Sequence, residues 1–341
     1  MRIGTRRRLR LLVRVVVSGT AIGSIYGVLL NLATRGGPRL GAPIGAIHGL
    51  ILSATIATLE VFGTRTRVGR AVEQAPFLVT LLVKGLVYGS LIALVNVAEP
   101  GTRLFRLPVD AGSVQLVSVF FSFGVIWAVL FIIQISQIIG GRTLRNWVLG
   151  RYHRPRQEER FFLFVDIVGS TALAERVGPV AVHSFLNRVF VLASDPVEDH
   201  RGEIYQYVGD EMVITWSIAA GVREARPIHC FLAIEATLDA ASVDFVRDFG
   251  LAPRVRGALH VGHVVVGEVG AQKRDIVFHG DVMNTTSRLE QMARELDRRL
   301  VVSADALDRL SGPHHVDLED LGAQTLRGRA SPLRIYATKT R

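Results

Sequence analysis

"RFFLFVDIVGSTALAE" (residues 160–175) places a single acid, Asp166, at the end of an almost wholly apolar run. The run predicts a strand buried on both faces, where an unpaired carboxylate is costly. The small step Gly169, Ser170 and Thr171 then opens a helical pattern. Free backbone N–H groups at a helix start attract phosphate. The stretch is therefore compatible with a site for a metal and a phosphate group.

A second acid, Asp210, stands in "GEIYQYVGDEMVITW" (residues 202–216), where Gly-Asp separates two strand-like runs. This is a hairpin signal, although weaker than Asp-Gly or Asn-Gly. If the hairpin neighbours the first strand, Asp166 and Asp210 meet at one sheet edge, where carboxylates hold Mg²⁺ or Mn²⁺. Alternatively, Asp166 caps the helix at Ser170 and Asp210 serves only the turn. The spacing alone leaves both interpretations open.

From Phe161 onward, strand and helix periodicities alternate, which predicts an α+β fold around a mainly antiparallel sheet. Within the 341 residues we expect three parts: a four-helix transmembrane bundle (residues 1–140), a cytoplasmic connector (residues 141–160) and a soluble domain (residues 161–341). The single cysteine, Cys230, excludes an intrachain disulfide and a cysteine-based metal cluster.

The first half contains apolar runs long enough to cross a bilayer, which takes about 20 residues. They are Leu11–Ala33, Ala42–Gly63, Phe77–Val97 and Val114–Ile139. Residues 1–150 hold 16 Lys and Arg against 4 Asp and Glu, whereas residues 151–341 hold 24 against 26. Because the basic residues flank apolar runs instead of covering the soluble domain, we expect a membrane and no nucleic acid as partner.

Arginines concentrate at the amino terminus, between the second and third runs, and after the fourth run. Since cytoplasmic loops carry the excess of Lys and Arg, we expect a multi-pass protein of the inner (cytoplasmic) membrane. Both termini and the soluble domain are then cytoplasmic. The outer loops are too short for a sensing domain, so a signal would come from membrane lipid, a small membrane-soluble molecule or a partner helix.

Two further patterns mark the apolar runs. Small residues recur at four-residue spacing, at Gly19, Gly23, Gly27, Gly41, Gly45 and Gly49. This spacing permits close helix packing, either within one chain or between subunits. Glu60 and Lys84 lie toward the cytoplasmic ends of neighbouring runs, so we expect them either to pair or to extend to the interface.

The second half resembles the class III nucleotidyl cyclases, the adenylate and guanylate cyclase family. Three motifs carry the resemblance, in the family's order: "FLFVDIVGST" (162–171), "YQYVGDEMVITW" (205–216) and "GDVMNTTSRLE" (280–290). The resemblance covers roughly residues 160–340. It implies a dimeric catalytic domain that converts a nucleoside triphosphate into a 3′,5′-cyclic monophosphate and pyrophosphate.

The resemblance also implies roles for individual residues. Asp166 and Asp210 correspond to the family's metal-binding aspartates, with the backbone carbonyl of Ile167 as a further ligand for two Mg²⁺ or Mn²⁺ ions. Asn284 would orient the ribose, and Arg288 would stabilise charge on the α-phosphate. In the family these two come from the partner subunit of a homodimer, so each site spans the interface. Arg327 falls near a basic residue that contacts the triphosphate.

Two positions depart from the family pattern. Gln206 stands where adenylate cyclases commonly place Lys, and Val277 stands where they place Asp or Thr. Gln can donate or accept a hydrogen bond and Val can do neither, so base selection differs in detail. Tyr205, Asp275 or His279 could contribute instead.

The leading hypothesis is therefore a membrane-bound adenylate cyclase acting on ATP. A guanylate or mixed-specificity cyclase that accepts GTP is the first alternative, motivated by Gln206 and Val277. The second alternative is a catalytically silent membrane sensor that binds nucleotide or lipid.

Overall fold

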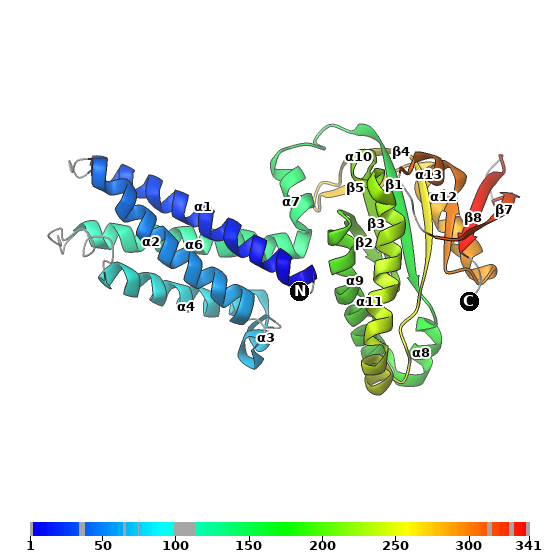
Figure 1. Cartoon of the computed structure of the whole chain (residues 1–341), viewed down its shortest axis with the longest axis horizontal. Helices are drawn as coiled ribbons and strands as arrows, with labels where there is room; N and C mark the ends of the chain where they lie inside the picture. Colours follow the sequence, from blue (N-terminus) through cyan, green and yellow to red (C-terminus); the bar gives the residue numbers. More distant parts are fainter. Residues whose placement is uncertain are drawn as a thin grey trace. The chain divides into compact units, whose positions relative to one another are not determined.

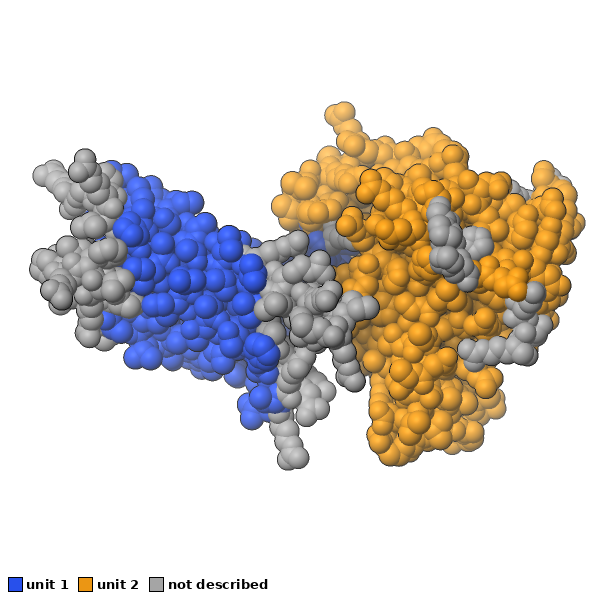
Figure 2. Space-filling view, in the orientation of Figure 1, with its two compact units in different colours: residues 1–144 blue, residues 145–341 orange. Residues whose placement is uncertain are grey.

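The computed structural model describes residues 3–33, 38–63, 66–73, 75–98, 113–311, 316–326 and 331–338. The chain divides into two compact units, residues 1–144 and residues 145–341 (Figure 2). The described part of the first unit is helical, and the second unit combines helices with a β-sheet. This is the predicted fold class.

The first unit contains four helices that, within the described residues, are long and apolar enough to cross a membrane. They are α1 (Ile3–Ala33), α2 (Pro38–Thr58), α4 (Phe77–Ala98) and α6 (Ser113–Ile139). The others are the π-helical turn η1 (Leu59–Gly63), α3 (Arg67–Glu73) and α7 (Gly141–Val148), which continues into the second unit. Large apolar side chains face outward, among them Leu86 (66% exposed) and Phe120 (73% exposed). Apolar exposure on this scale suits a lipid environment.

Glycines bring α1 and α2 into close contact. A methyl group on Gly23 would clash with the carbonyl oxygen of Gly45, and one on Gly27 would clash with that of Gly41. Only residues without a side chain allow two helix backbones to approach this closely. The small-residue spacing thus serves packing within one chain, which confirms the first of the two interpretations.

Glu60 and Lys84 form the expected ion pair. Nζ of Lys84 on α4 lies 3.0 Å from both carboxylate oxygens of Glu60 on η1. The hydroxyl of Tyr88 donates a third hydrogen bond to Glu60, at 2.8 Å. Charged groups within an apolar bundle are stabilised by such pairing.

The second unit is built on one sheet. Among the described residues, eight strands contribute to it in the order β2-β3-β1-β4-β6-β8-β7, with β5 paired to β4. Every pair is antiparallel except β4 with β6. The strands are β1 (Arg156–Ile167), β2 (Glu203–Val208), β3 (Glu211–Ser217), β4 (Val255–Val269), β5 (Asp275–His279), β6 (Leu300–Ser303), β7 (Leu318–Gln324) and β8 (Leu333–Thr338).

Helices cover both faces of this sheet. They are α8 (Ser170–Val177), α9 (Pro179–Asp199), α10 (Ile218–Gly221), the 3₁₀ turn η2 (Arg223–Ala225), α11 (Arg226–Phe249), α12 (Asp281–Glu295) and α13 (Ala304–Arg309). The long helices α9 and α11 lie side by side over one face (Figure 1). Helix α12 packs against β4 and β1.

The position of β1 explains its apolar sequence. It lies between β3 and β4 and is buried on both sides. Leu163 and Val165 join the core cluster that includes α9 and α11, whereas Phe162 and Phe164 join the cluster that includes the start of α12. Because strand side chains alternate between faces, Asp166 continues the second row. The fold therefore directs Asp166 toward α12.

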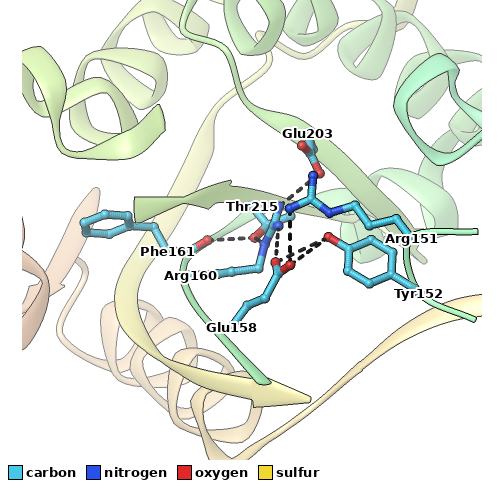
Figure 3. Close-up of polar contacts among 7 residues, drawn as sticks. All are labelled: Arg151, Tyr152, Glu158, Arg160, Phe161, Glu203 and Thr215. Carbon is cyan, nitrogen blue, oxygen red and sulfur yellow. Dashed lines mark hydrogen bonds and ion pairs between the residues drawn. The ribbon is translucent and has the colours of Figure 1, made fainter. Parts of the chain in front are cut away.

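A charged network stands at the other end of this row (Figure 3). Arg160 is buried, and its guanidinium donates to Thr215 (3.0 Å), Glu158 (3.1 Å) and Glu203 (2.9 Å). It also lies over the ring of Phe278, 5.1 Å from the centroid. We call the following residues the Arg160 cluster: Arg151, Tyr152, Glu158, Arg160, Glu203 and Thr215.

The segment predicted as connector has two structured ends. Helix α7 forms its start, and β1 begins inside it at Arg156. Between them, Tyr152 is buried and donates its hydroxyl to Glu158, while its carbonyl accepts from the amide of Glu268 at 3.1 Å. This part of the segment packs onto the sheet of the second unit. Its role as a link stays a prediction.

Candidate active site

Asp166 lies near the end of β1, on the face that α12 covers. It is 5% exposed, and its strand neighbours are Glu211 on β3 and Arg256 on β4. Its Oδ2 accepts a hydrogen bond from Nη2 of Arg294 on α12, 3.2 Å away. Within the described part of the chain, this is the one hydrogen bond to the Asp166 carboxylate. The predicted metal ligand is thus a buried carboxylate beside an arginine.

Asp210 occupies the turn between β2 and β3, as the sequence predicts. Gly209 precedes it with φ 63°, in the left-handed region that glycine adopts without strain. The backbone carbonyl of Asp210 accepts from the amide of Ile167 at 3.3 Å, and its carboxylate accepts from the hydroxyl of Ser170. The turn is therefore joined to the end of β1 and to the start of α8.

The two aspartates belong to an acidic cluster, which we define as Asp166, Asp210, Glu211 and Glu290. Burial raises the pKa of Asp166 to about 6, and repulsion from Glu290 and Asp210 adds to the effect. Burial also raises the pKa of Glu211 to about 7, again with repulsion from Glu290 and the aspartates. Both carboxylates therefore lie in a buried cluster of acids, which a bound cation would stabilise.

A divalent metal fits this donor set. Over the residues that the structure describes, no group of three or more His, Cys, Asp or Glu is arranged to hold a metal ion. The protein would therefore supply two carboxylates, Asp166 and Asp210, together with a backbone carbonyl such as that of Ile167. Mg²⁺ is commonly held by one or two carboxylates, with substrate phosphates and water completing its shell.

The start of α8 has the features of a phosphate-binding turn. Gly169 adopts φ 81°, and α8 begins at Ser170. The amide of Leu173 donates back to the carbonyl of Gly169 at 3.0 Å, so the amides of Ser170 and Thr171 lie before the first intrahelical bond. The Ser170 hydroxyl is engaged with Asp210. Backbone N–H groups are thus the phosphate donors that this turn offers.

A cavity of about 340 Å³ borders the same turn at Val168. Its charged lining consists of Arg254, Arg256, Arg298, Arg299, Glu235, Asp239 and Asp297. The amide of Val168 donates to the carbonyl of Arg254 at 2.9 Å, which fixes the turn beside this wall. Arg256 pairs with Asp297 at 3.1 Å. Arg298 pairs with Glu319 at 2.8 Å and Arg299 with Glu235 at 2.9 Å, so most guanidinium groups of this wall have carboxylate partners.

Asn284 and Arg288 lie on α12, one turn apart. Asn284 is exposed, and Arg288 is half-buried. Nη1 of Arg288 is buried and has no hydrogen-bond partner. Among the described residues, no hydrogen bond or ion pair joins Asn284 or Arg288 to Asp166 or Asp210. One chain therefore brings the two predicted metal ligands to the same sheet edge, but it does not join Asn284 or Arg288 to them.

The two positions predicted to recognise the base lie on β2 and β5. Gln206 is exposed and follows an irregularity of β2 at Tyr205, while Val277 is half-buried. The hydroxyl of Tyr205 accepts from the amide of Phe278 at 3.4 Å, and the two rings pack edge to face with centroids 4.7 Å apart. Tyr205 thus connects the strands that carry both positions. Arg327 lies outside the described residues.

The sequence interpretation missed three charged residues of this site. Glu211 directly follows Asp210, and its strand register places it opposite Asp166. Glu290 and Arg294 stand four residues apart on α12. This spacing predicts an ion pair between them, but it does not predict which residues lie beside the pair. Only the packing of α12 on β1 reveals that this pair adjoins Asp166.

Comparisons with known proteins identify the family of the second unit. Residues 153–339 match the family described as the adenylate and guanylate cyclase catalytic domain. Adenylate cyclase 2 of Rhizobium meliloti (strain 1021) is 35% identical over 303 residues, which cover 87% of this chain and 83% of the relative. Adenylate cyclase 1 of the same organism is 33% identical over 184 residues, but the match covers only 27% of that relative.

A solved structure of a bacterial light-regulated adenylyl cyclase superposes with a TM-score of 0.50 at 21% identity. The match covers 64% of this chain and 65% of that chain, and it shows a shared fold. The fold and the site define a nucleotidyl cyclase catalytic domain. This chain belongs to the class III adenylate and guanylate cyclase family.

Proposed function

We propose that the protein is a membrane-anchored adenylate cyclase that converts ATP into 3′,5′-cyclic AMP and pyrophosphate. The observation that carries the proposal is the junction of the Asp210 turn with the end of β1 beside Asp166, where the amide of Ile167 and the hydroxyl of Ser170 both donate to Asp210. The relative named adenylate cyclase 2 supports the choice of ATP, because its similarity extends over 87% of the chain.

In the proposed reaction, the ribose 3′ oxygen attacks the α-phosphorus and the bond to the oxygen bridging the β-phosphate breaks. Asp166, Asp210 and the carbonyl of Ile167 would hold two Mg²⁺ or Mn²⁺ ions. When bound, the ions would supply the charge that activates the 3′-hydroxyl and stabilises the departing pyrophosphate. The amides at the start of α8 would hold the polyphosphate chain.

Asn284 and Arg288 would act on the same substrate from a second copy of the chain. Successive helix residues are rotated by about 100°, so Arg288 points roughly 160° away from Glu290 around α12. Glu290 faces the acidic cluster of its own chain, since it shares Arg294 with Asp166. Arg288, whose Nη1 has no partner, faces elsewhere. This arrangement supports a homodimer with sites shared between chains.

The four apolar helices of the first unit would anchor the enzyme. Their length, composition and outward-facing apolar side chains support insertion into the inner membrane. The arginine bias supports cytoplasmic termini and a cytoplasmic catalytic unit. A periplasmic reporter fused after Gly36 should be active, and the same reporter after Arg341 should be inactive. The reverse pattern would contradict the orientation.

GTP is the second candidate substrate, because Gln206 is exposed and its amide can both donate and accept. The decisive experiment uses the full chain in detergent with Mg²⁺ or Mn²⁺ and compares cyclic AMP formed from ATP with cyclic GMP formed from GTP. We expect the higher kcat/KM with ATP. Higher turnover of GTP would favour the guanylate cyclase alternative. Nucleotide binding without any cyclic product would support the silent sensor and overturn the proposal.

Complementation tests the shared site. Asp166→Ala and Arg288→Ala should each be inactive alone, because each removes one half of every site in a homodimer. Mixing the two variants should restore activity, since one site of a mixed dimer then keeps both residues. No recovery on mixing, with both variants folded and associated, would contradict a site formed between chains.

A further inference from the structure

We infer that Arg294 is the built-in counter-ion of Asp166, which it neutralises until a divalent metal arrives, and that Glu290 is the carboxylate to which Arg294 then withdraws. Arg294 is thus a positioning residue that competes with the metal for one oxygen of Asp166. This inference rests on the proposed function, because it assumes that Asp166 is a metal ligand.

The geometry assigns Arg294 two carboxylate partners at once. Its Nη2 lies 3.2 Å from Oδ2 of Asp166 and 3.2 Å from Oε1 of Glu290. The Glu290 side chain is 5% exposed and lies one helical turn before Arg294, so this partner is fixed on the same helix. Withdrawal from Asp166 to Glu290 alone would require no movement of α12.

The side chain of Arg294 is far more exposed than those of its two carboxylate partners. The Arg294 side chain is 59% exposed, whereas those of Asp166 and Glu290 are 7% and 5% exposed. A long, largely exposed side chain can leave an ion pair at little cost, because such pairs are weak and screened by water. The buried carboxylates would then keep their positions for the metal.

Charge explains why a counter-ion is needed. Asp166 is surrounded by Asp210, Glu211 and Glu290, and the nearby Arg256 is engaged by Asp297. Arg294 places a guanidinium nitrogen 3.2 Å from Asp166 and offsets part of this negative charge. The positive charge of Arg294 also repels an incoming metal ion, so the affinity of the site for the metal is reduced.

The test measures Mn²⁺ binding to the full chain in detergent at pH 8 without nucleotide, from the electron paramagnetic resonance signal of free Mn²⁺. Arg294→Gln should lower the Mn²⁺ dissociation constant by about three- to tenfold, the range expected for one partly exposed ion pair. Arg294→Lys, which keeps the charge, should stay closer to the wild type than Arg294→Gln does.

Arg247→Gln is the matched control, because Arg247 is also largely exposed (66%) and pairs with Asp244 and Asp248 on α11. It should leave Mn²⁺ affinity unchanged. Glu290→Gln should weaken Mn²⁺ binding, since Arg294 then has Asp166 as its nearest carboxylate. The weakening should be smaller when Arg294→Gln is already present, which a double-mutant cycle measures.

The outcomes separate this inference from the proposed function. If the wild type binds Mn²⁺ and Asp166→Asn does not, the metal site stands. Unchanged or weaker binding by a folded Arg294→Gln then overturns the inference alone. If Arg294→Gln fails to fold, unchanged binding by Glu290→Gln overturns it instead. If the wild type binds no Mn²⁺ at millimolar concentration, both the metal site and the inference fail.

Discussion

Arg160 and Asp166 stand six residues apart in the same row of β1, yet their surroundings differ in kind. The Arg160 cluster contains two arginines and two glutamates, and the guanidinium of Arg160 has a partner at Nε, Nη1 and Nη2. The acidic cluster contains four carboxylates with raised pKa values at Asp166 and Glu211. Balanced charge and complete hydrogen bonding stabilise the folded chain, whereas an excess of one charge is typical of a site that binds a ligand.

The largest expected effect is the loss of catalysis when the acidic cluster loses a metal ligand. Asp166→Asn and Asp210→Asn should each reduce kcat by at least about a hundredfold, because the amide cannot hold a cation as the carboxylate does. Cyclic AMP formation from ATP measures the loss. Thermal unfolding in EDTA should show no loss of stability, which distinguishes a functional carboxylate from a structural one. Wild-type activity in either variant would contradict the assignment of that carboxylate as a metal ligand.

The next effect is structural and belongs to the Arg160 cluster. Arg160→Met would leave Glu158 and Glu203 without their buried partner, at a cost of about 3–5 kcal/mol in the free energy of unfolding. The unfolding temperature of the catalytic unit should fall by roughly 10 °C, as followed by near-ultraviolet circular dichroism. Arg247→Met, at an exposed ion pair, should change the unfolding temperature little. A similarly small change for Arg160→Met would contradict a structural role.

The smallest expected effect is a gain in stability, in contrast to the losses of activity and stability expected above. Because the pKa of Glu211 rises from 4.5 to about 7 on folding, the folded chain retains a proton that the unfolded chain has lost. The free energy of unfolding in EDTA should therefore fall as the pH rises from about 4.5 to about 7. Asp166 acts in the same direction between 3.8 and about 6.

Glu211→Gln removes this penalty. At pH 8 in EDTA it should raise the unfolding temperature by about 2–4 °C, which corresponds to roughly 1 kcal/mol, and at pH 4 it should change little. Differential scanning calorimetry at the two pH values provides the measurement. Destabilisation at pH 8 would mean that Glu211 is compensated in the folded state, like the glutamates of the Arg160 cluster.

Much of the site follows from local sequence. The apolar run before Asp166 predicts a strand buried on both faces, and β1 is such a strand. Gly209 and Asp210 predict the hairpin turn, which forms between β2 and β3. In the first unit, hydrophobic length predicts the helices. These features depend on periodicity and turn chemistry, which neighbouring residues determine.

Other features depend on contacts between distant segments, which periodicity does not specify. Arg294 meets Asp166 across 128 positions of sequence, and Arg160 meets Glu203 across 43. Both contacts arise from strand register and from the docking of α12, and a shift of one residue would move either side chain to the opposite face.

By itself, the sequence determined a membrane-type helical half, an α+β cyclase domain, and the acids at the end of one buried strand and in one hairpin turn. The length of an apolar run, the alternation of apolar residues and the presence of turn-forming residues are local properties, so they can be recognised from the sequence alone. Tertiary packing alone decided that Ser170 joins Asp210 and that Glu290 and Arg294 adjoin Asp166. The physical reason is that a buried charge takes its properties from neighbours that the fold, and not the chain order, brings together.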